Sequence, residues 1–182
     1  AMAGDYKVKL TSDNAKGSFT VTVESDVKSE MNVENASQLK AALGNKAVTT
    51  INLKADIELS EALEINRAVT INGNGHSLDK NVVIGSQGKN VTLNDVEVKN
   101  NENAYAVQVY DTYGVTLNNV TATSSRKGAI LINGSTVKLT GTTTVDGAWG
   151  GIEVSKGVGV KGMPELTVEG TLVNNSDGVV LW

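Results

Sequence analysis

Aromatic residues are rare in this sequence, and several lie where their rings could contact a ligand. Trp149 stands in the segment Asp146–Gly151 beside glycine and alanine residues, which leaves an indole free to stack on a sugar ring or on a partner. The same ring could instead fold back over a corner of the fold. Amide and carboxylate side chains on nearby strands could bind hydroxyl groups. The predicted ligand-binding residues are Trp149, Tyr110, Tyr105, Tyr113, Gln108 and Glu153.

Acidic side chains suggest one candidate metal site. Asp95 and Glu97 lie close together, and Asp111 follows the next apolar segment. Calcium takes about six to eight oxygen ligands, so these carboxylates would need further donors around them. Calcium is the only cofactor that this pattern suggests. The single histidine, His76, follows two Asn-Gly pairs, and we interpret it as a corner residue bonded to the backbone.

A repeated segment indicates how these side chains are positioned. Its clearest copy is Val69–His76, and the copies recur at intervals of about 22 to 29 residues with alternating apolar and polar positions. Repeats of this length without helix-length gaps are typical of a β-solenoid. The further copies begin at Val91, Val115, Val137 and Leu166.

Each coil contains a second strand, which predicts the faces of the solenoid. Because side chains alternate along a strand, aligned residues form columns on one face. We predict two inward aliphatic columns, one from Leu63 to Val179 and one from Ile65 to Leu181, in about six coils. An asparagine column at Asn72, Asn94 and Asn118 is expected to stack at a turn. The outward positions, including Val83, Leu131, Val180 and Trp182, form a half-apolar strip.

The N-terminal part of the chain differs from the repeats. Residues 1–4 are interpreted as a cloning remnant, and residues 5–32 as a β-hairpin segment that packs on the solenoid or remains from a preceding domain. Residues 33–182 form the predicted β-helix. Its capping helix spans residues 35–43, with Asn35 as N-cap, Gln38 three residues later, and Gly44 closing the end.

Composition excludes several kinds of partner. The net charge of −4 argues against nucleic acid or an anionic membrane. No segment is long and apolar enough for membrane insertion. The chain contains no cysteine, which rules out disulfides and thiolate metal sites. We interpret the sequence as one module of a larger multidomain chain.

The order of these elements resembles a known family. A helix at Gln38–Leu43 is followed by Ile51–Ile57, by Leu63–Ile65 and then by Val69–Leu78. This succession is similar to the N-terminal part of right-handed parallel β-helices of the pectate-lyase-like superfamily. The similarity is greatest to the pectate-lyase-like adhesive modules of Gram-positive bacterial surface proteins, and it covers residues 33–182. It implies an all-β, right-handed, single-stranded parallel β-helix with an N-terminal capping helix.

The resemblance also implies a function. It favours a non-catalytic module, secreted or attached to the cell wall or surface, that binds polysaccharide or another host or cell-surface ligand. Enzymes of the superfamily leave a calcium-dependent polysaccharide lyase as the alternative, with Arg126 and Lys127 as candidate bases. Hydrolases of the superfamily carry Gly-His-Gly, whereas His76 here stands in Gly-Asn-Gly-His. A purely structural stalk or spacer is the second alternative.

Overall fold

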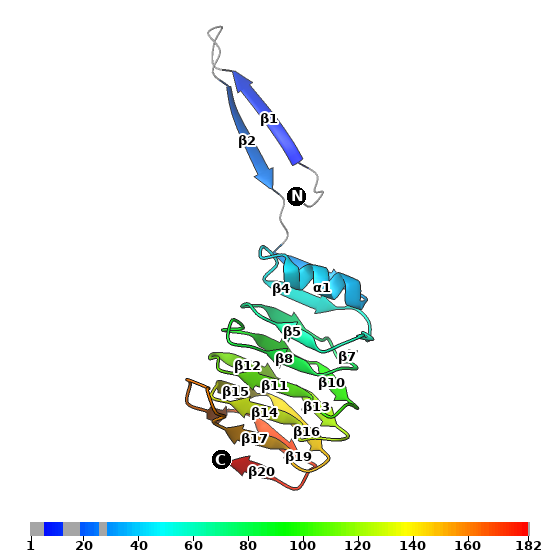
Figure 1. Cartoon of the computed structure of the whole chain (residues 1–182). Helices are drawn as coiled ribbons and strands as arrows, with labels where there is room; N and C mark the ends of the chain where they lie inside the picture. The colour runs from blue at the N-terminus through cyan, green and yellow to red at the C-terminus, as the bar shows by residue number, and fades with distance from the viewer. Residues whose placement is uncertain (1–5, 13–18, 26–28, 182) are drawn as a thin grey trace.

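The computed structural model describes residues 6–12, 19–25 and 29–181. From Glu30 onward the chain forms a parallel β-solenoid of about five turns, with strands stacked into three sheets (Figure 1). The seven-stranded sheet contains β3 (Glu30–Val33), β4 (Thr50–Leu53), β6 (Thr70–Asn72), β9 (Thr92–Asn94), β12 (Val115–Asn118), β15 (Thr136–Thr140) and β18 (Glu165–Val168).

Two further sheets complete the wall of the solenoid. The six-stranded sheet contains β5 (Leu63–Ile65), β8 (Val82–Ile84), β11 (Val107–Tyr110), β14 (Ile130–Asn133), β17 (Ile152–Ser155) and β20 (Val179–Leu181). The five-stranded sheet contains β7 (Ser77–Leu78), β10 (Glu97–Asn100), β13 (Thr121–Ser124), β16 (Thr142–Gly147) and β19 (Thr171–Asn174).

The solenoid fold was predicted correctly, but two details of the coil differ. Each full turn has three strands rather than two, because the five-stranded sheet uses short strands that begin soon after the asparagine turn. The number of turns is about five rather than six, since the turn that begins with β4 contributes only the isolated bridge between Ile57 and Leu78 to that sheet. An isolated bridge involves too few residues to produce an alternation of apolar and polar residues in the sequence.

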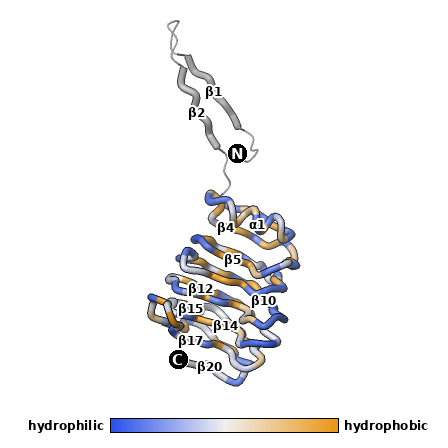
Figure 2. The backbone as a smooth tube through the Cα atoms, viewed as in Figure 1, coloured by the Kyte–Doolittle hydropathy of each residue, from blue (hydrophilic) through white to orange (hydrophobic). Residues whose placement is uncertain are grey.

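Aliphatic columns fill most of the interior as predicted. Leu63, Val82, Val107, Ile130, Ile152 and Val179 are in register across the six-stranded sheet. All of them are buried except Val179, which lies in the last turn and is 43% exposed. Ile65, Ile84, Val109 and Ile132 of the second column are fully buried. The apolar residues therefore follow the strands, and many turns are hydrophilic (Figure 2). Stacked β-branched side chains pack well on such pleated surfaces.

The predicted asparagine column is longer in the structure. Asn52 Nδ2 donates to Asn32 Oδ1 at 3.2 Å, Asn72 Nδ2 to Asn52 Oδ1 at 2.8 Å, and Asn94 Nδ2 to Asn72 Oδ1 at 2.9 Å. Asn118 lies in register with Asn94 and accepts a bond from Thr140 Oγ1 at 2.9 Å. The ladder satisfies amides that would otherwise lose water at this corner. Its role is structural.

Helix α1 (Ala36–Gly44) covers the N-terminal end of the solenoid (Figure 1). Asn35 Oδ1 accepts the N–H of Gln38 at 3.0 Å, so the predicted N-cap is confirmed. Leu39 is fully buried against the first coils. The helix ends one residue later than predicted, with Asn45 as C-cap instead of a left-handed glycine. Arg67 Nε and Nη2 donate to the last helical carbonyls at 2.7 and 2.9 Å, which satisfies groups that a helix end leaves unpaired.

The N-terminal hairpin consists of β1 (Tyr6–Ser12) and β2 (Phe19–Ser25), paired antiparallel. The two strands form a sheet of their own, which Figure 1 draws beyond the helix-capped end of the solenoid. The side chains that were expected to cover the outward strip, and also Trp182 and residues 1–4, lie outside the described residues. The covering of the strip by the hairpin therefore stays a prediction.

Candidate functional site

An aromatic cluster lies where the five-stranded sheet leads into the six-stranded sheet. The rings of Tyr105 and Trp149 meet edge to face, with centroids 5.9 Å apart and an interplanar angle of 74°. Lys127 Nζ lies 5.8 Å from the centroid of each ring. Tyr105 is 7% exposed and Trp149 is 37% exposed. The indole therefore rests on the tyrosine and keeps a large part of its surface open to solvent.

The three residues of this cluster come from equivalent places in successive turns. Tyr105 precedes β11, Lys127 precedes β14, and Trp149 precedes β17. Parallel neighbouring strands stack at about 4.8 Å, so side chains from consecutive turns can touch along the solenoid axis. Edge-to-face packing and a cation over aromatic rings are both favourable arrangements. The aromatic cluster is thus a continuous surface and not a set of isolated rings.

Glu153 completes one side of the cluster. The Tyr105 hydroxyl donates a hydrogen bond to Glu153 Oε2, across the turn that carries β14. Burial and then this bond raise the pKa of Tyr105 above its ordinary value. Burial and then the charge of Glu153 also raise the pKa of Tyr110. Both phenols therefore stay protonated at neutral pH and can donate hydrogen bonds.

The ring of Tyr105 lies over a gap left by Gly128. A Cβ atom placed on Gly128 would meet Tyr105 Cε1 at 2.7 Å and Cδ1 at 3.1 Å. Because glycine has no side chain, the ring can approach the backbone closely at Gly128.

Leu131, on the outward face of the same turn, is only 5% exposed. Its outward position was predicted from the sequence, but its burial was not.

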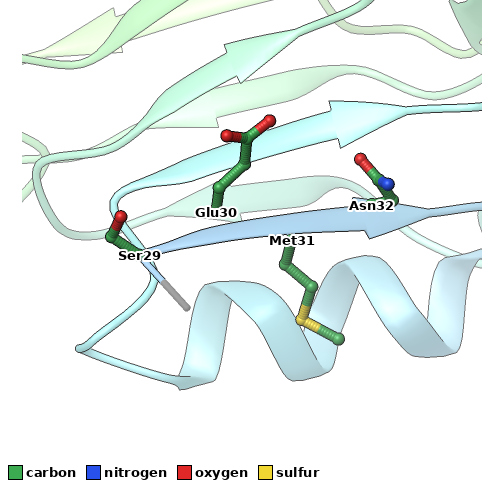
Figure 3. A pocket seen from close by; sticks show the side chains of 4 residues that line it. All are labelled: Ser29, Glu30, Met31 and Asn32. Atoms are coloured by element: carbon green, nitrogen blue, oxygen red, sulfur yellow. The ribbon is translucent and has the colours of Figure 1, made fainter. Parts of the chain in front are cut away.

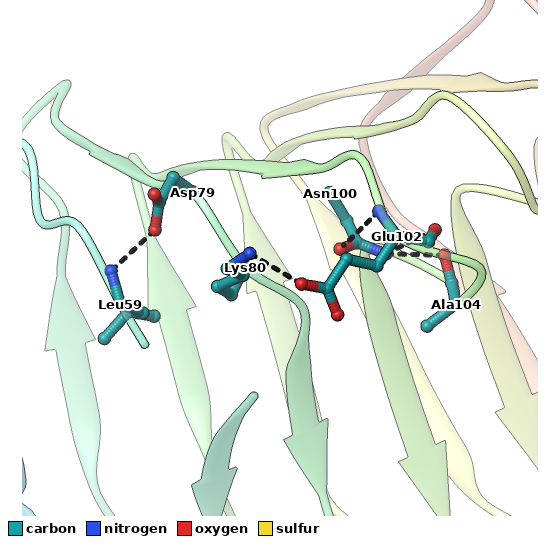
Figure 4. A network of polar contacts seen from close by, with 6 residues as sticks. All are labelled: Leu59, Asp79, Lys80, Asn100, Glu102 and Ala104. Atoms are coloured by element: carbon teal, nitrogen blue, oxygen red, sulfur yellow. Dashed lines mark hydrogen bonds and ion pairs between the residues drawn. The ribbon is translucent and has the colours of Figure 1, made fainter. Parts of the chain in front are cut away.

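A polar network holds the loop that precedes Tyr105 (Figure 4). Asn100 is 3% exposed, and its Nδ2 donates to Ala104 O at 2.7 Å and to Glu102 O at 3.2 Å. Lys80 Nζ binds Glu102 Oε1 at 2.6 Å. On the next turn, Ser124 Oγ donates to Ala104 O at 2.8 Å and accepts the N–H of Lys127 at 3.1 Å. The backbone beside Tyr105 and Lys127 is therefore fixed by side-chain bonds.

The remaining predicted ligand-binding residues lie at different places. Gln108 is on the outward face of β11, in register with Val83 and Leu131. Tyr110 ends the same strand and is partly buried. Tyr113 is 51% exposed at the next corner, where Lys89 Nζ lies 5.1 Å from its ring. The structure thus joins Tyr105, Trp149 and Glu153, and places Tyr113 at the other end of the strand.

Sequence reasoning gave Lys127 a different role. It was considered only as a candidate base of a lyase, whereas the structure places it against two aromatic rings. A usable signal was present, because Tyr105, Lys127 and Trp149 are equally spaced in the sequence. Spacing equal to the coil length brings residues together along a solenoid. The sequence contained no comparable signal that Gly128 lies beside the Tyr105 ring.

The three candidate calcium ligands have separate structural roles. Asp95 has a φ of 46° at its turn, and Glu97 Oε2 pairs with Lys99 Nζ at 2.8 Å. Asp111 Oδ1 accepts the backbone N–H groups of Lys161 and Gly162 at 3.1 and 2.9 Å. Within residues 29–181 and the hairpin strands, no three His, Cys, Asp or Glu residues are grouped so that they could hold a metal ion. The acidic residues therefore do not converge as the calcium site requires.

His76 lies at a corner, as expected. Its Nδ1 is 3.4 Å from Asp56 Oδ1. The same carboxylate oxygen accepts the backbone N–H of Ser77 at 2.8 Å. This backbone bond is the main cause that lowers the pKa of Asp56. The pair joins two successive turns.

A hollow at the N-terminal end is lined by Ser29, Glu30, Met31 and Asn32. Figure 3 shows Met31 directed toward α1, with Glu30 and Asn32 on the other side of β3. Met31 packs against the core, while Glu30 and Asn32 both accept bonds from Asn52 Nδ2. These side chains serve the helical cap and the asparagine ladder, so the hollow is not the candidate ligand site.

The described helix is too short to cross a membrane. No curated protein and no solved structure matches the chain. Residues 30–140, more than half of the chain, match the family described as "Putative pectate lyase-like adhesive domain". This match covers the strands from β3 to β15 and agrees with the parallel solenoid and its helical cap. The resemblance found in the sequence is confirmed: the protein belongs to the pectate lyase-like adhesive domain family.

Proposed function

We propose that this protein is a non-catalytic adhesive module that binds carbohydrate through the aromatic cluster. The observation that carries the proposal is the Trp149 indole, 37% exposed and held edge to face by Tyr105. A fixed aromatic ring offers a large apolar surface at a low cost in conformational entropy. Lys127 lies beside the indole, and Gln108 and Tyr110 add hydrogen-bonding groups on the six-stranded sheet. The family to which the chain belongs supports an adhesive role.

The module acts outside the cell in this proposal, either secreted or attached to the wall or surface. Adhesion to a polysaccharide or another surface ligand requires that the outer face of the six-stranded sheet reach that ligand. A rigid solenoid can present such a face without a conformational change. The adhesive family supports a location at the surface, and fractionation of the native host would test it directly.

The first experiment is a glycan array probed with the whole chain, followed by titration of each bound glycan. Trp149→Ala should weaken binding about tenfold or more, because truncation of a central aromatic contact typically costs over ~1 kcal/mol. Tyr113→Ala is the matched control, since this exposed ring lies at the other end of the strand. Unchanged affinity of Trp149→Ala would contradict the assigned site. If no glycan on the array binds, the remaining interpretation is a purely structural spacer.

The lyase alternative is tested separately. The protein is incubated with polygalacturonate and calcium, and the ultraviolet absorbance of unsaturated product is followed. We expect no signal above the buffer control. A signal that a chelator abolishes would contradict the non-catalytic proposal.

A further inference from the structure

The five turns that lead from the six-stranded sheet to the seven-stranded sheet form a second surface, here called the basic corner. They comprise residues 66–69, 85–91, 111–114, 134–135 and 156–164. Their basic residues are Arg67, Lys89, Lys156 and Lys161, and their one acidic residue is Asp111. The chain as a whole has a net charge of −4. Positive charge is therefore concentrated along one edge of an otherwise acidic protein.

The charged side chains of the basic corner differ in whether they are bonded within the protein or exposed. Arg67 is committed to the helix carbonyls, and Asp111 is committed to two backbone N–H groups. Lys89, Lys156 and Lys161 are exposed. These three ammonium groups are the exposed positive charges of the corner. Two acidic residues border it: Glu64 in β5 accepts a bond from Asn66 at 3.3 Å, and Glu165 begins β18 directly after the last turn.

The last of these turns, residues 156–164, projects from the solenoid at the left of Figures 1 and 2. Its base is fixed to the turn of residues 111–114 and to the end of β14. Asp111 Oδ1 accepts the N–H groups of Lys161 and Gly162, and Asn133 Oδ1 accepts the N–H of Gly157 at 2.8 Å. The loop is therefore held in one position by bonds from other turns, although it projects.

Two apolar side chains of this loop are exposed. Val158 is 108% exposed and Met163 is 69% exposed, the two most exposed large apolar residues among those described. Glycines flank Val158, and Lys156 Nζ lies 3.4 Å from Met163 Sδ. Further along the corner, Lys89 stands over the exposed ring of Tyr113. Two apolar side chains, an aromatic ring and three lysines thus lie along one edge of the solenoid.

We propose that the basic corner is a peripheral docking surface for an anionic lipid bilayer. Amphipathic interfacial segments combine projecting apolar side chains with lysines beside them, and tyrosine is enriched at membrane interfaces. Val158 and Met163 enter the headgroup region, while the lysines pair with anionic headgroups. The loop of residues 156–164 projects from the solenoid, so it can reach a flat and deformable lipid surface.

The proposal differs from the expectation drawn from composition. A net charge of −4 argued against an anionic membrane, but that charge is summed over the whole chain. At physiological ionic strength, salt limits the interaction between exposed charges to a range of about 8–10 Å. A local group of lysines therefore acts on a nearby surface largely independently of distant carboxylates. No part of this contact requires a spanning segment.

The test is sedimentation of the whole chain with sucrose-loaded vesicles. One set contains phosphatidylcholine alone, and the other contains phosphatidylcholine with about one third phosphatidylglycerol. We expect binding to the anionic vesicles that weakens as salt rises, and little binding to the neutral ones. Equal binding to both sets, or none to either, would overturn the proposal.

Two variants separate the apolar and ionic parts. Lys89→Gln with Lys156→Gln and Lys161→Gln should reduce the partition constant about a hundredfold, since each lysine near an anionic surface contributes roughly fivefold. Val158→Ser with Met163→Ser should reduce it by tenfold or more. The matched control replaces Lys54, Lys99 and Lys138 by glutamine, which changes net charge equally on other parts of the surface.

The outcomes distinguish a lipid surface from other anionic partners. If the serine variant binds vesicles like the original protein while the glutamine variant does not, the corner is a general polyanion site and the lipid proposal is wrong. If the lysine control weakens binding as much as the corner variant, the local charge pattern has no role. Far-ultraviolet circular dichroism and urea unfolding of every variant verify that the solenoid is intact.

Discussion

The outer faces of the seven-stranded and six-stranded sheets are built by the same turns, yet they differ in regularity. On the seven-stranded sheet, Thr50, Thr70, Thr92 and Thr116 are in register, and the asparagine ladder runs beside them. On the six-stranded sheet the outward column changes at every turn, from Glu64 through Val83, Gln108 and Leu131 to Glu153. The seven-stranded sheet therefore repeats the same residue types at its outward positions, whereas the six-stranded sheet has a different residue type from turn to turn.

This difference indicates where structure and function reside. A repeated column stabilises stacking, because each residue bonds or packs against its own copy in the next turn. A varied column has no stabilising contacts between identical residues in successive turns. The varied column of the six-stranded sheet includes Glu153, and Tyr105 and Trp149 lie near its edge. Hence substitutions in the repeated columns should affect stability, and substitutions around the aromatic cluster should affect binding.

The largest effect is expected in the core beneath the regular face. Leu117 is fully buried and lies in register with Leu93 and Leu139. Leu117→Ala should lower the free energy of unfolding by about 2–5 kcal/mol, because it leaves a cavity between two stacked turns. Urea unfolding followed by circular dichroism measures this change. A loss below about 1 kcal/mol would mean that the turns do not depend on the repeated column.

The asparagine ladder provides the next test. Asn72→Ala removes the donor to Asn52 and the acceptor for Asn94 at once. We expect a loss of about 1–3 kcal/mol in the free energy of unfolding, since partly buried amides lose their partners. Ser60→Ala, at an exposed position outside the strands, is the control and should change stability by less than about 0.5 kcal/mol. Equal effects of the two substitutions would remove the structural role of the ladder.

A substitution beneath the aromatic cluster should test whether the position of Tyr105 affects binding. Gly128→Ala places a Cβ atom 2.7 Å from Tyr105 Cε1, so the ring must move. We expect about fivefold weaker binding to the glycan found on the array, with a stability loss of about 1–2 kcal/mol. Gly44→Ala is the control, because a Cβ there meets nothing within 4 Å. Unchanged affinity of Gly128→Ala would show that the position of Tyr105 does not matter for the ligand.

The smallest effect concerns pH. The pKa of Tyr105 is raised in the folded protein by burial and by its bond to Glu153. Below about pH 10 the phenol is protonated in both states, and above it the unfolded chain loses this proton first, so stability falls. Tyr105→Phe should therefore flatten the decline in the free energy of unfolding between neutral pH and pH 11. Parallel curves for the two proteins would rule out this contribution.

Much of the fold was predictable because it repeats. The two inward columns, the asparagine turn and the N-cap at Asn35 were each read from residue type and spacing. The third strand was missed because segments such as Ser77–Leu78 are too short to show a periodicity. The role of the candidate ligand residues stays a prediction, and the contact of Tyr105 with Glu153 could not be predicted because it depends on a bond across an intervening turn.

The sequence alone determined how the chain is wound, because periodic apolar residues can be buried together only by stacking successive turns. It also supplied the prediction of which aromatic residues stack on a ligand. Only the tertiary structure decided which of them meet: Lys127 joins Tyr105 and Trp149, Tyr113 is left at the opposite corner, and Asp95, Glu97 and Asp111 serve separate turns. The reason is that side-chain contacts between turns depend on the register of each corner loop, and these loops differ in length and carry no repeat.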